Sequence, residues 1–527
     1  MNIIITAAGE SKRFYTAGHN KPKFLLKINQ KTMIENVIDM FNDTDIFHII
    51  LNEDHYNKFK KDIKKIKKIK KNINFYFIKF DKEGPVKSIL QVSELKKIKG
   101  PIIISYCDFL LDWNYQKFKR DAYGYDGAIP CFKDFHPSSF GKTLYAYVKI
   151  NKKNKILKIQ EKKSFTKNRI KEPASVGIYY FKNFEIFKFF SKKLLIKKKK
   201  IHKEYYVSLV YNEMINVGLN VIKTSVEKFI CLGTPEDLDQ YLFWYEVFNN
   251  KNINIKNYNQ TNLIPLAGAG DRFKIKKYKV RKPFISIQNK PMIVASCESL
   301  PQSKNWVFLI RNKDLKKYPI KKKLSSKFNS SIIPVKSKTD GQLSTCYLAK
   351  DTILDNKPLF ISSGDYQVVF SHKKLNSLIN NSAIDGIVWT TNLKGLLYDN
   401  PNNFAYCKIT NKNIIKKVVE KKTISQSPEN DPMVVGCFWF RKKQDFIDAA
   451  ENSFKKKLTV NNEHYVGNSI NYLIKKKKRK FVIFNIKYWI SFGNPFELDV
   501  YGYWEEFFYK NKNEQYNINY DEKITPN

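Results

Sequence analysis

Short apolar runs alternate along the chain with segments in which apolar residues recur at helical spacing. Buried strands are predicted at residues 3–5, 46–51, 75–80 and 102–105, and in the second half at 262–265, 306–310 and 359–362. Residues 32–41 and 86–95 lie between strands and show the spacing of amphipathic helices. The alternation predicts an α/β fold with a largely parallel sheet.

The chain also repeats itself. The run Ala7-Ala8-Gly9-Glu10-Ser11-Lys12-Arg13-Phe14 recurs as Leu266-Ala267-Gly268-Ala269-Gly270-Asp271-Arg272-Phe273, so that Arg13 and Arg272 stand 259 positions apart. Lys23 and Lys282 keep this offset, as do Glu161 and Glu420. We therefore predict two tandem copies of one domain, at 1–248 and 262–508, with an Asn-rich linker at 249–261 and a polar tail at 509–527.

Chemically useful residues follow the predicted strands. Gly9 follows the first strand, and Asp108 ends another; Gly268 and Asp365 are their counterparts in the second copy. Ligands of open α/β sheets bind beyond the carboxyl ends of the strands. We therefore expect these residues to share one edge of each sheet.

Composition narrows the class of protein. The chain of 527 residues is 43% hydrophobic and 15% aromatic, which excludes a wholly disordered or collagen-like protein. No apolar run approaches about 18 residues, and the N-terminus does not resemble a signal peptide, so we expect no membrane association. The seven Cys are scattered and form no C-x-x-C pair, which favours a reducing cytoplasm over a disulfide framework or a zinc site.

The net charge of +46 first suggests a polyanionic partner such as nucleic acid. The excess is nearly all Lys spread along the chain, and the clusters at 58–71, 192–200 and 475–480 are typical of solvated helix faces and loops. Because no recognition motif accompanies them, we predict no specific nucleic-acid partner.

A Gly loop between a strand and a helix lets the backbone approach a phosphate and donate N–H groups to it. Alone, such a loop is better explained as a tight βα turn. Four residue types occur in the same order in both copies, which favours a phosphate site: Gly9, Arg13, Lys23 and Asp108, and again Gly268, Arg272, Lys282 and Asp365.

These residues resemble the signature of the nucleotidyltransferase family that makes sugar nucleotides. A-A-G-x-S-x-R-F with P-K-F-L-L, and L-A-G-x-G-x-R-F with R-K-P-F-I, carry the resemblance, together with K-E-Y-Y-V-S at 203–208 and L-G-T-P-E-D-L at 232–238. The resemblance implies two tandem GT-A-like Rossmann-type domains, each a mainly parallel sheet with helices on both faces. It also implies condensation of a nucleoside triphosphate with a sugar 1-phosphate or related phosphomonoester, with Mg²⁺ as cofactor and pyrophosphate as product.

Physical chemistry agrees with that reaction. A phosphate monoester is already an anionic nucleophile, so in-line attack needs positioning and charge neutralisation more than a general base. By analogy, we expect a role in surface polysaccharide synthesis.

The resemblance assigns roles residue by residue. The expected phosphate-neutralising catalytic residues are Arg13, Lys23, Arg272 and Lys282. The expected nucleotide-binding residues are Ala8, Gly9, Gly84, Gly268, Gly270, Gly341 and Gln342. Glu161, Lys162, Glu420 and Lys421 would bind the acceptor, although either Glu-Lys pair alone also fits an exposed ion pair. Asp108 and Asp365 would bind Mg²⁺.

Both copies depart from the family pattern. Cys231 and Ser491 stand where many members have a second metal-binding Asp, so we expect Mg²⁺ to rest on one carboxylate and the phosphates. Ser11 replaces a second Gly, and Pro85 stands where the other copy has Gln342, a residue suited to reading a base edge.

Two other functions stay open. One copy could be catalytic and the other a non-catalytic nucleotide- or sugar-binding domain with a regulatory or scaffold role. A nucleic-acid-binding protein is the third reading and would need a steeply salt-dependent affinity. The nucleobase, the acceptor and the oligomeric state are not defined by the sequence.

Overall fold

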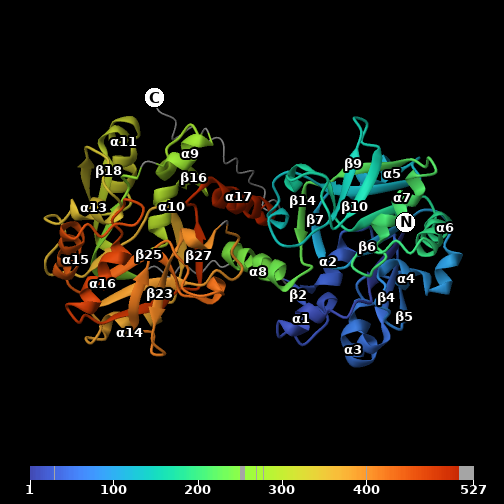
Figure 1. The fold of residues 1–527 in the computed structure, drawn as a ribbon, viewed down its shortest axis with the longest axis horizontal. Helices are drawn as coiled ribbons and strands as arrows, with labels where there is room; N and C mark the ends of the chain where they lie inside the picture. The colour runs from blue at the N-terminus through green and yellow to red at the C-terminus, as the bar shows by residue number, and fades with distance from the viewer. Residues whose placement is uncertain (29, 250–255, 269, 277, 399, 510–527) are drawn as a thin grey trace. The chain divides into compact units, whose positions relative to one another are not determined.

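The computed structural model describes residues 1–28, 30–249, 256–268, 270–276, 278–398 and 400–509 (Figure 1). The chain folds into two compact units, Met1–Tyr245 and Glu246–Asn527. The predicted polar tail lies almost entirely outside the described residues. In the part that the structure describes, we find no helix with the length and apolarity needed to cross a membrane.

The first unit is built on a sheet whose central strands run in parallel. Its strand order is β5-β4-β1-β6-β12-β8, with β13 beside β8. β12 runs antiparallel to both of its neighbours, and β9, β10 and β11 extend the sheet beyond β8. The strands are β1 (Asn2–Ala7), β4 (Ile46–Asn52), β5 (Ile73–Ile78), β6 (Ile102–Tyr106), β8 (Gly127–Phe132), β9 (Ala146–Ile150), β10 (Ile156–Glu161), β11 (Ala174–Ser175), β12 (Ile178–Phe181) and β13 (Val221–Ser225).

Helices cover both faces of this sheet, because its central strands contain apolar runs whose successive side chains are buried on opposite faces. Ile3 and Ile5 point into one core cluster, and Ile4 points into another on the opposite face. The helices are α1 (Lys12–Thr16), α2 (Met33–Asp39), α3 (Glu53–Ile66), α4 (Pro85–Leu90), α5 (Tyr115–Ala122), α6 (Phe184–Ile196), α7 (Val207–Ile215) and α8 (Pro235–Asn249). α2, α3 and α5 contribute to the first cluster, and α4, α6 and α7 to the second. The predicted α/β fold is confirmed.

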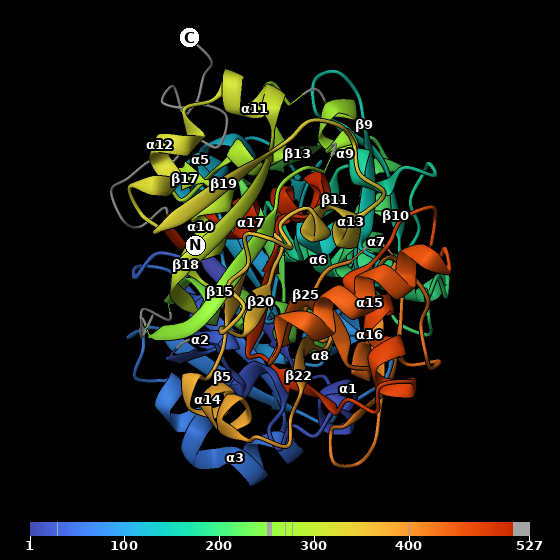
Figure 2. The same cartoon turned by 90° about the vertical axis from the view of Figure 1, so that its left-hand side faces the viewer.

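The second unit has the strand order β19-β18-β15-β20-β25-β22-β26, with the same parallel and antiparallel pairings, position by position, as the first. Its strands are β15 (Asn257–Pro265), β18 (Gln302–Arg311), β19 (Ser330–Val335), β20 (Leu359–Ile361), β22 (Gly386–Thr391), β23 (Ala405–Ile409), β24 (Ile415–Val419), β25 (Met433–Phe440) and β26 (Phe481–Asn485). Its helices are α9 (Asp271–Ile275), α10 (Met292–Glu298), α11 (Asn312–Lys317), α12 (Ile320–Ser325), α13 (Gln342–Tyr347), α14 (His372–Asn380), α15 (Lys443–Lys455), α16 (Val466–Lys475) and α17 (Pro495–Tyr509). α15 and α16 pack against each other (Figure 2).

Each unit also has two small antiparallel pairs. β7 (Phe109–Asp112) pairs with β14 (Lys228–Cys231), and β21 (Tyr366–Val369) pairs in the same way with β27 (Tyr488–Ser491). β2 (Lys27–Ile28) pairs with β3 (Lys31–Thr32), and β16 (Ser286–Ile287) with β17 (Lys290–Pro291). The first type of pair brings the chain after β6 or β20 next to the turn before the last helix.

The predicted linker is wrong for residues 257–261, because β15 begins at Asn257. Gln260 and the neighbouring Asn262 are buried: Gln260 Nε2 donates to Asn262 Oδ1 at 2.7 Å, and Asn262 Nδ2 donates to the Pro301 carbonyl at 2.8 Å. Hydrogen bonds of this kind let Asn and Gln occupy a buried strand. Composition alone therefore gave the wrong strand boundary.

The helix predicted at 86–95 is also shorter than expected. α4 ends at Leu90, Val92 is extended, and a 3-10 turn follows at Ser93–Lys97. Both Val92 and Leu95 are buried, so the apolar spacing marks two adjacent turns that pack on the same core.

Candidate active site

The parallel pairing of neighbouring strands places the Gly loop beside the strand-end Asp. β1 ends at Ala7 and lies next to β6, so that Ala8 and Gly9 leave the sheet near the end of the strand that leads to Asp108. β15 and β20 give the same arrangement before Gly268 and Asp365. No heavy atom lies within 4 Å of the position that a Cβ would take at Gly9 or Gly268. The loop backbone is therefore open to a ligand.

The residue that begins the helix after each loop has a left-handed backbone. Ser11 has φ of 58° at the start of α1, and Gly270 has φ of 67° at the start of α9. Such a φ favours Gly, which explains the family Gly at this position. Ser11 differs in having a side chain, and its Oγ accepts a hydrogen bond from the Lys23 backbone N–H at 3.0 Å.

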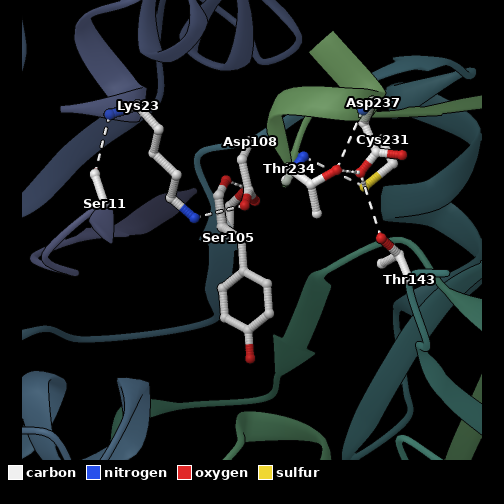
Figure 3. A network of polar contacts seen from close by, with 10 residues as sticks. Ser11, Lys23, Ser105, Asp108, Thr143, Cys231, Thr234 and Asp237 are labelled. Carbon is white, nitrogen blue, oxygen red and sulfur yellow. Dashed lines mark hydrogen bonds and ion pairs between the residues drawn. The ribbon is translucent and has the colours of Figure 1, made fainter. Parts of the chain in front are cut away.

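A Lys-Asp ion pair lies at the same edge of each sheet. Lys23 Nζ is 2.6 Å from Asp108 Oδ2 (Figure 3), and Lys282 Nζ is 2.6 Å from Asp365 Oδ2. Burial alone would lower the pKa of Lys23, but the negative charge of Asp108 and the hydrogen bond to it outweigh burial and raise that pKa above its ordinary value. Lys23 is therefore held as a cation next to a carboxylate.

The two Arg residues predicted for catalysis lie on the exposed short helices α1 and α9. The charge of Arg13 influences the pKa values of Lys23 and Tyr206, and that of Arg272 influences the pKa values of Lys421 and Tyr465. Each Arg is thus close enough to these side chains for its charge to act on them.

A turn with a carboxylate from the following helix stands beside each strand-end Asp. In the first unit Thr234 Oγ1 and Cys231 Sγ donate to Asp237 Oδ2 at 2.9 and 3.4 Å (Figure 3). In the second unit Ser491 Oγ donates to Glu497 Oε2 at 2.6 Å. Neither carboxylate was predicted from the sequence, because an acidic residue in the first turn of a helix is common in capping.

The Glu-Lys pair of the first unit is not an exposed ion pair. Glu161 is only 6% exposed, ends β10 and accepts a hydrogen bond from Ser208 Oγ. Lys162 has φ of 58°, donates to the Leu144 carbonyl at 2.7 Å and lies 3.6 Å from Glu161 Oε1. A buried carboxylate with a neighbouring ammonium can bind hydroxyl and phosphate groups together.

The second unit differs at the residue that contacts the Glu. Gly467 replaces Ser208, and a Cβ there would collide with Glu420 Oε1. Burial raises the pKa of Glu420 to about 7, against the opposing effect of the Lys421 charge. Burial also lowers the pKa of Lys421, although Glu420 opposes that shift.

The Gly residues before α4 and α13 also have left-handed φ values, 95° at Gly84 and 99° at Gly341. A Cβ on Gly341 would stand 2.6 Å from the His464 carbonyl oxygen, so this turn must pack directly on the segment before α16. Gln342 Nε2 donates to Ser363 Oγ at 3.1 Å. The first unit has Pro85 and Tyr106 at these two positions, which makes its surface less polar.

Among the residues that the structure describes, no three His, Cys, Asp or Glu side chains gather as a ready metal site. The space around Gly233 and Gly493 is nevertheless suited to a cation. A Cβ on Gly233 would stand 3.3 Å from Asp108 Oδ2, and one on Gly493 would stand 3.9 Å from Asp365 Oδ2. The absence of a side chain at each glycine thus leaves space that faces a carboxylate. The Asp residues would fit a divalent cation there, with substrate phosphates as its other ligands.

Comparison with known proteins supplies a family for the first unit. Residues 2–225 match the family model described as nucleotidyl transferase. No curated protein matches the chain at a significant level.

Similar solved structures each cover somewhat less than half of this chain. They include a nucleoside-diphosphate-sugar pyrophosphorylase from Vibrio cholerae RC9, with 20% identity, 46% of this chain and 99% of the other covered, and a TM-score of 0.39. The inositol-1-phosphate CTP transferase from T. maritima has 15% identity, coverage of 47% and 95%, and a TM-score of 0.38. A UDP-glucose pyrophosphorylase complexed with UDP-glucose has 17% identity, coverage of 48% and 100%, and a TM-score of 0.37.

The family model, rather than these weak structural likenesses, carries the assignment. Residues 2–225 therefore form a domain of the nucleotidyl transferase family of enzymes.

Proposed function

We propose that the chain condenses a nucleoside triphosphate with a sugar 1-phosphate or a related phosphomonoester, giving a sugar nucleotide and pyrophosphate. The observation that carries the proposal is the Lys-Asp pair at the end of a parallel strand beside an open Gly loop, present in both units. An ammonium and a metal-binding carboxylate at one edge supply the charge neutralisation that phosphoryl transfer needs.

In the first unit, the backbone at Ala8 and Gly9 would bind the triphosphate together with Arg13. Lys23 would neutralise the phosphates that react, and Glu161 with Lys162 would bind the hydroxyls and the phosphate of the acceptor. The second unit would use Gly268, Gly270, Arg272, Lys282, Glu420 and Lys421 in the same roles. Gly84, Gly341 and Gln342 would hold the nucleoside.

Asp108 and Asp365 would hold Mg²⁺, which when bound draws the triphosphate oxygens into position and neutralises part of their charge. Each Lys is held at this edge by its Asp, where its ammonium would also face the phosphate oxygens of the substrates. Because the acceptor phosphate is anionic, the chain needs no side chain to remove a proton from it.

We also propose that the two units have unlike substrates. Gln342 with Ser363 offers a polar surface, whereas Pro85 with Tyr106 offers a less polar one. The alternative is one catalytic unit and one non-catalytic unit that binds a nucleotide or sugar as a regulatory or scaffold domain. The polysaccharide pathway and a cytoplasmic location belong to the same proposal; the seven free, buried cysteines support a reducing compartment.

A screen of pyrophosphate release tests the proposal, with four nucleoside triphosphates against a panel of sugar 1-phosphates and other phosphomonoesters. We expect release that needs both substrates and Mg²⁺. Nucleotide binding without release in any combination would favour a binding protein instead.

The raised pKa of Glu420 gives a prediction for pH dependence. Its value of about 7 means that the side chain is mostly protonated at about pH 6 and mostly ionised at about pH 8. An ionised carboxylate accepts stronger hydrogen bonds from hydroxyls, so the affinity of the second unit for its acceptor should rise over this range. Acceptor KM measured against pH checks this, and Glu420→Gln should remove the dependence.

The same shift affects stability with the opposite sign. The folded pKa lies above the ordinary value of 4.5, so ionisation favours the unfolded chain, and the contribution of Glu420 to the free energy of unfolding should fall as pH rises from 4.5 to about 7.

A KM that is unchanged across the pH range in the unsubstituted protein would contradict the role of Glu420 in acceptor binding.

A further inference from the structure

The turn between β27 and α17 gathers oxygen ligands around a glycine. A Cβ on Gly493 would stand 2.9 Å from Glu497 Oε2, 3.2 Å from Ser491 Oγ and 3.9 Å from Asp365 Oδ2. The glycine therefore leaves a small space that two carboxylates and a hydroxyl face together. Lys282 Nζ closes one side of it, since it donates to Asp365 Oδ2 and, at 2.9 Å, to the Gly493 carbonyl.

The equivalent space in the first unit is different. The three atoms nearest to a Cβ on Gly233 are Asp108 Oδ2 at 3.3 Å, Cys231 Sγ at 3.4 Å and Asp108 Cγ at 3.9 Å. Asp237 accepts hydrogen bonds from Thr234, from Cys231 Sγ and, at 3.4 Å, from Thr143 Oγ1, as Figure 3 shows, and none of its atoms is among the three nearest to that Cβ.

We propose that Glu497 is the second carboxylate of the cation site in the second unit. It would replace the second metal-binding Asp of the family, whose position is occupied here by Ser491. The proposal rests on the proposed function, in which Asp365 binds Mg²⁺. Hard divalent cations select oxygen ligands, and Mg²⁺ lies about 2.1 Å from each. The second unit offers such a set around Gly493, whereas the nearest atoms around Gly233 in the first unit belong to one carboxylate and a soft sulfur.

Local hydrogen bonds hold Glu497 in place for this role. Ser491 Oγ donates to its carboxylate at 2.6 Å, and Asn494 Oδ1 accepts from its backbone N–H at 3.0 Å. The backbone bond begins α17 without using the carboxylate. Oriented ligands of this kind bind a metal more tightly, because less freedom is lost on binding.

Mn²⁺ alone is the probe, and its binding to the full-length protein is followed by the loss of the free-ion signal in electron paramagnetic resonance. Asp108→Asn as a background removes the site of the first unit, so the site of the second unit can be measured. On this background, Glu497→Gln should weaken Mn²⁺ binding at least about tenfold. Asp237→Asn on an Asp365→Asn background is the matched control and should leave Mn²⁺ affinity unchanged.

A carboxylate restored at a neighbouring residue tests whether Mn²⁺ binding depends on a carboxylate beside Gly493. Ser491→Asp added to Glu497→Gln should recover most of the Mn²⁺ affinity, because it places a carboxylate beside the same glycine. If the Glu497→Gln protein binds Mn²⁺ as tightly as the protein with Glu497 and melts at the same temperature, Glu497 only caps α17 and the proposal is wrong. If Glu497→Gln does not fold, the more conservative Glu497→Asp replaces it: weakened Mn²⁺ binding supports the proposal, and unchanged binding overturns it.

The Mn²⁺ titration does not depend on turnover. A chain that releases no pyrophosphate but loses Mn²⁺ with Glu497→Gln would keep this inference and contradict the proposed reaction. A chain that releases pyrophosphate but whose Mn²⁺ binding is unaffected by Glu497→Gln would support the proposed reaction and contradict this inference.

Discussion

Asp108→Asn should abolish the Mg²⁺-dependent turnover of the first unit, and Asp365→Asn that of the second. Each Asp follows the end of a strand and pairs with the Lys that we place at the reacting phosphates. Loss of its charge therefore removes both a cation ligand and the partner of that Lys. We expect a fall of at least about a hundredfold in kcat, comparable to loss of one transition-state contact. Pyrophosphate release with the substrates of each unit measures it.

The fold should survive these substitutions, because Asn keeps the shape of Asp. The main-chain carbonyl of Asp108 accepts from Leu232 N–H at 2.8 Å, and that of Asp365 accepts from Phe492 N–H at 2.8 Å, and neither bond uses the side chain. Thermal melts serve as the control. Full activity in both substituted units would show that neither carboxylate holds the cation, and a large loss of stability would indicate a structural role instead.

Lys23→Ala and Lys282→Ala should each lower kcat by about two orders of magnitude, which corresponds to roughly 3 kcal/mol. An ammonium beside the transferring phosphates acts mainly on the charge that develops in the transition state, so kcat should fall more than substrate affinity. If both units are catalytic, each substitution removes one substrate profile and spares the other. Steady-state kinetics on the full-length protein, with each Lys replaced in turn, separate the two.

Surface ion pairs of the same geometry provide controls for these Lys substitutions. Lys21 pairs with Asp62 at 2.6 Å and Lys290 with Glu298 at 2.7 Å, and we give neither pair a role in the site. Their replacement by Ala should leave kcat unchanged. If the protein shows only one set of substrates, and its turnover is lost with one of the Lys23→Ala and Lys282→Ala substitutions but not with the other, the unit whose Lys has no effect is a non-catalytic domain.

Much of the fold follows from periodicity in the sequence. Runs such as residues 3–5 are apolar at every position, and the structure buries them on both faces of a sheet. The polar start of β15 could not be predicted in this way. Gln260 and Asn262 satisfy each other's hydrogen bonds only once the strand is buried, and that pairing leaves no periodic signal.

The predicted site follows from strand order, but its differences between units do not. The prediction that the Gly loop and the strand-end Asp share an edge needs only that β1 and β6 be parallel neighbours. The raised pKa of Glu420 depends on burial in the folded unit, and the part that Gly467 plays beside it is visible only in three dimensions. Glu497 was missed for a similar reason, because its distance to Asp365 is set by the turn at Gly493.

The fate of isotope label tests the central claim most directly. With nucleoside triphosphate labelled at the α-phosphate, the label should appear in a sugar nucleotide, and with label at the γ-phosphate it should appear in pyrophosphate. This pattern places the bond cleavage between the α- and β-phosphates. Transfer of the γ-label to the acceptor, or no transfer of either label while both substrates bind, would contradict the proposal that this chain makes sugar nucleotides.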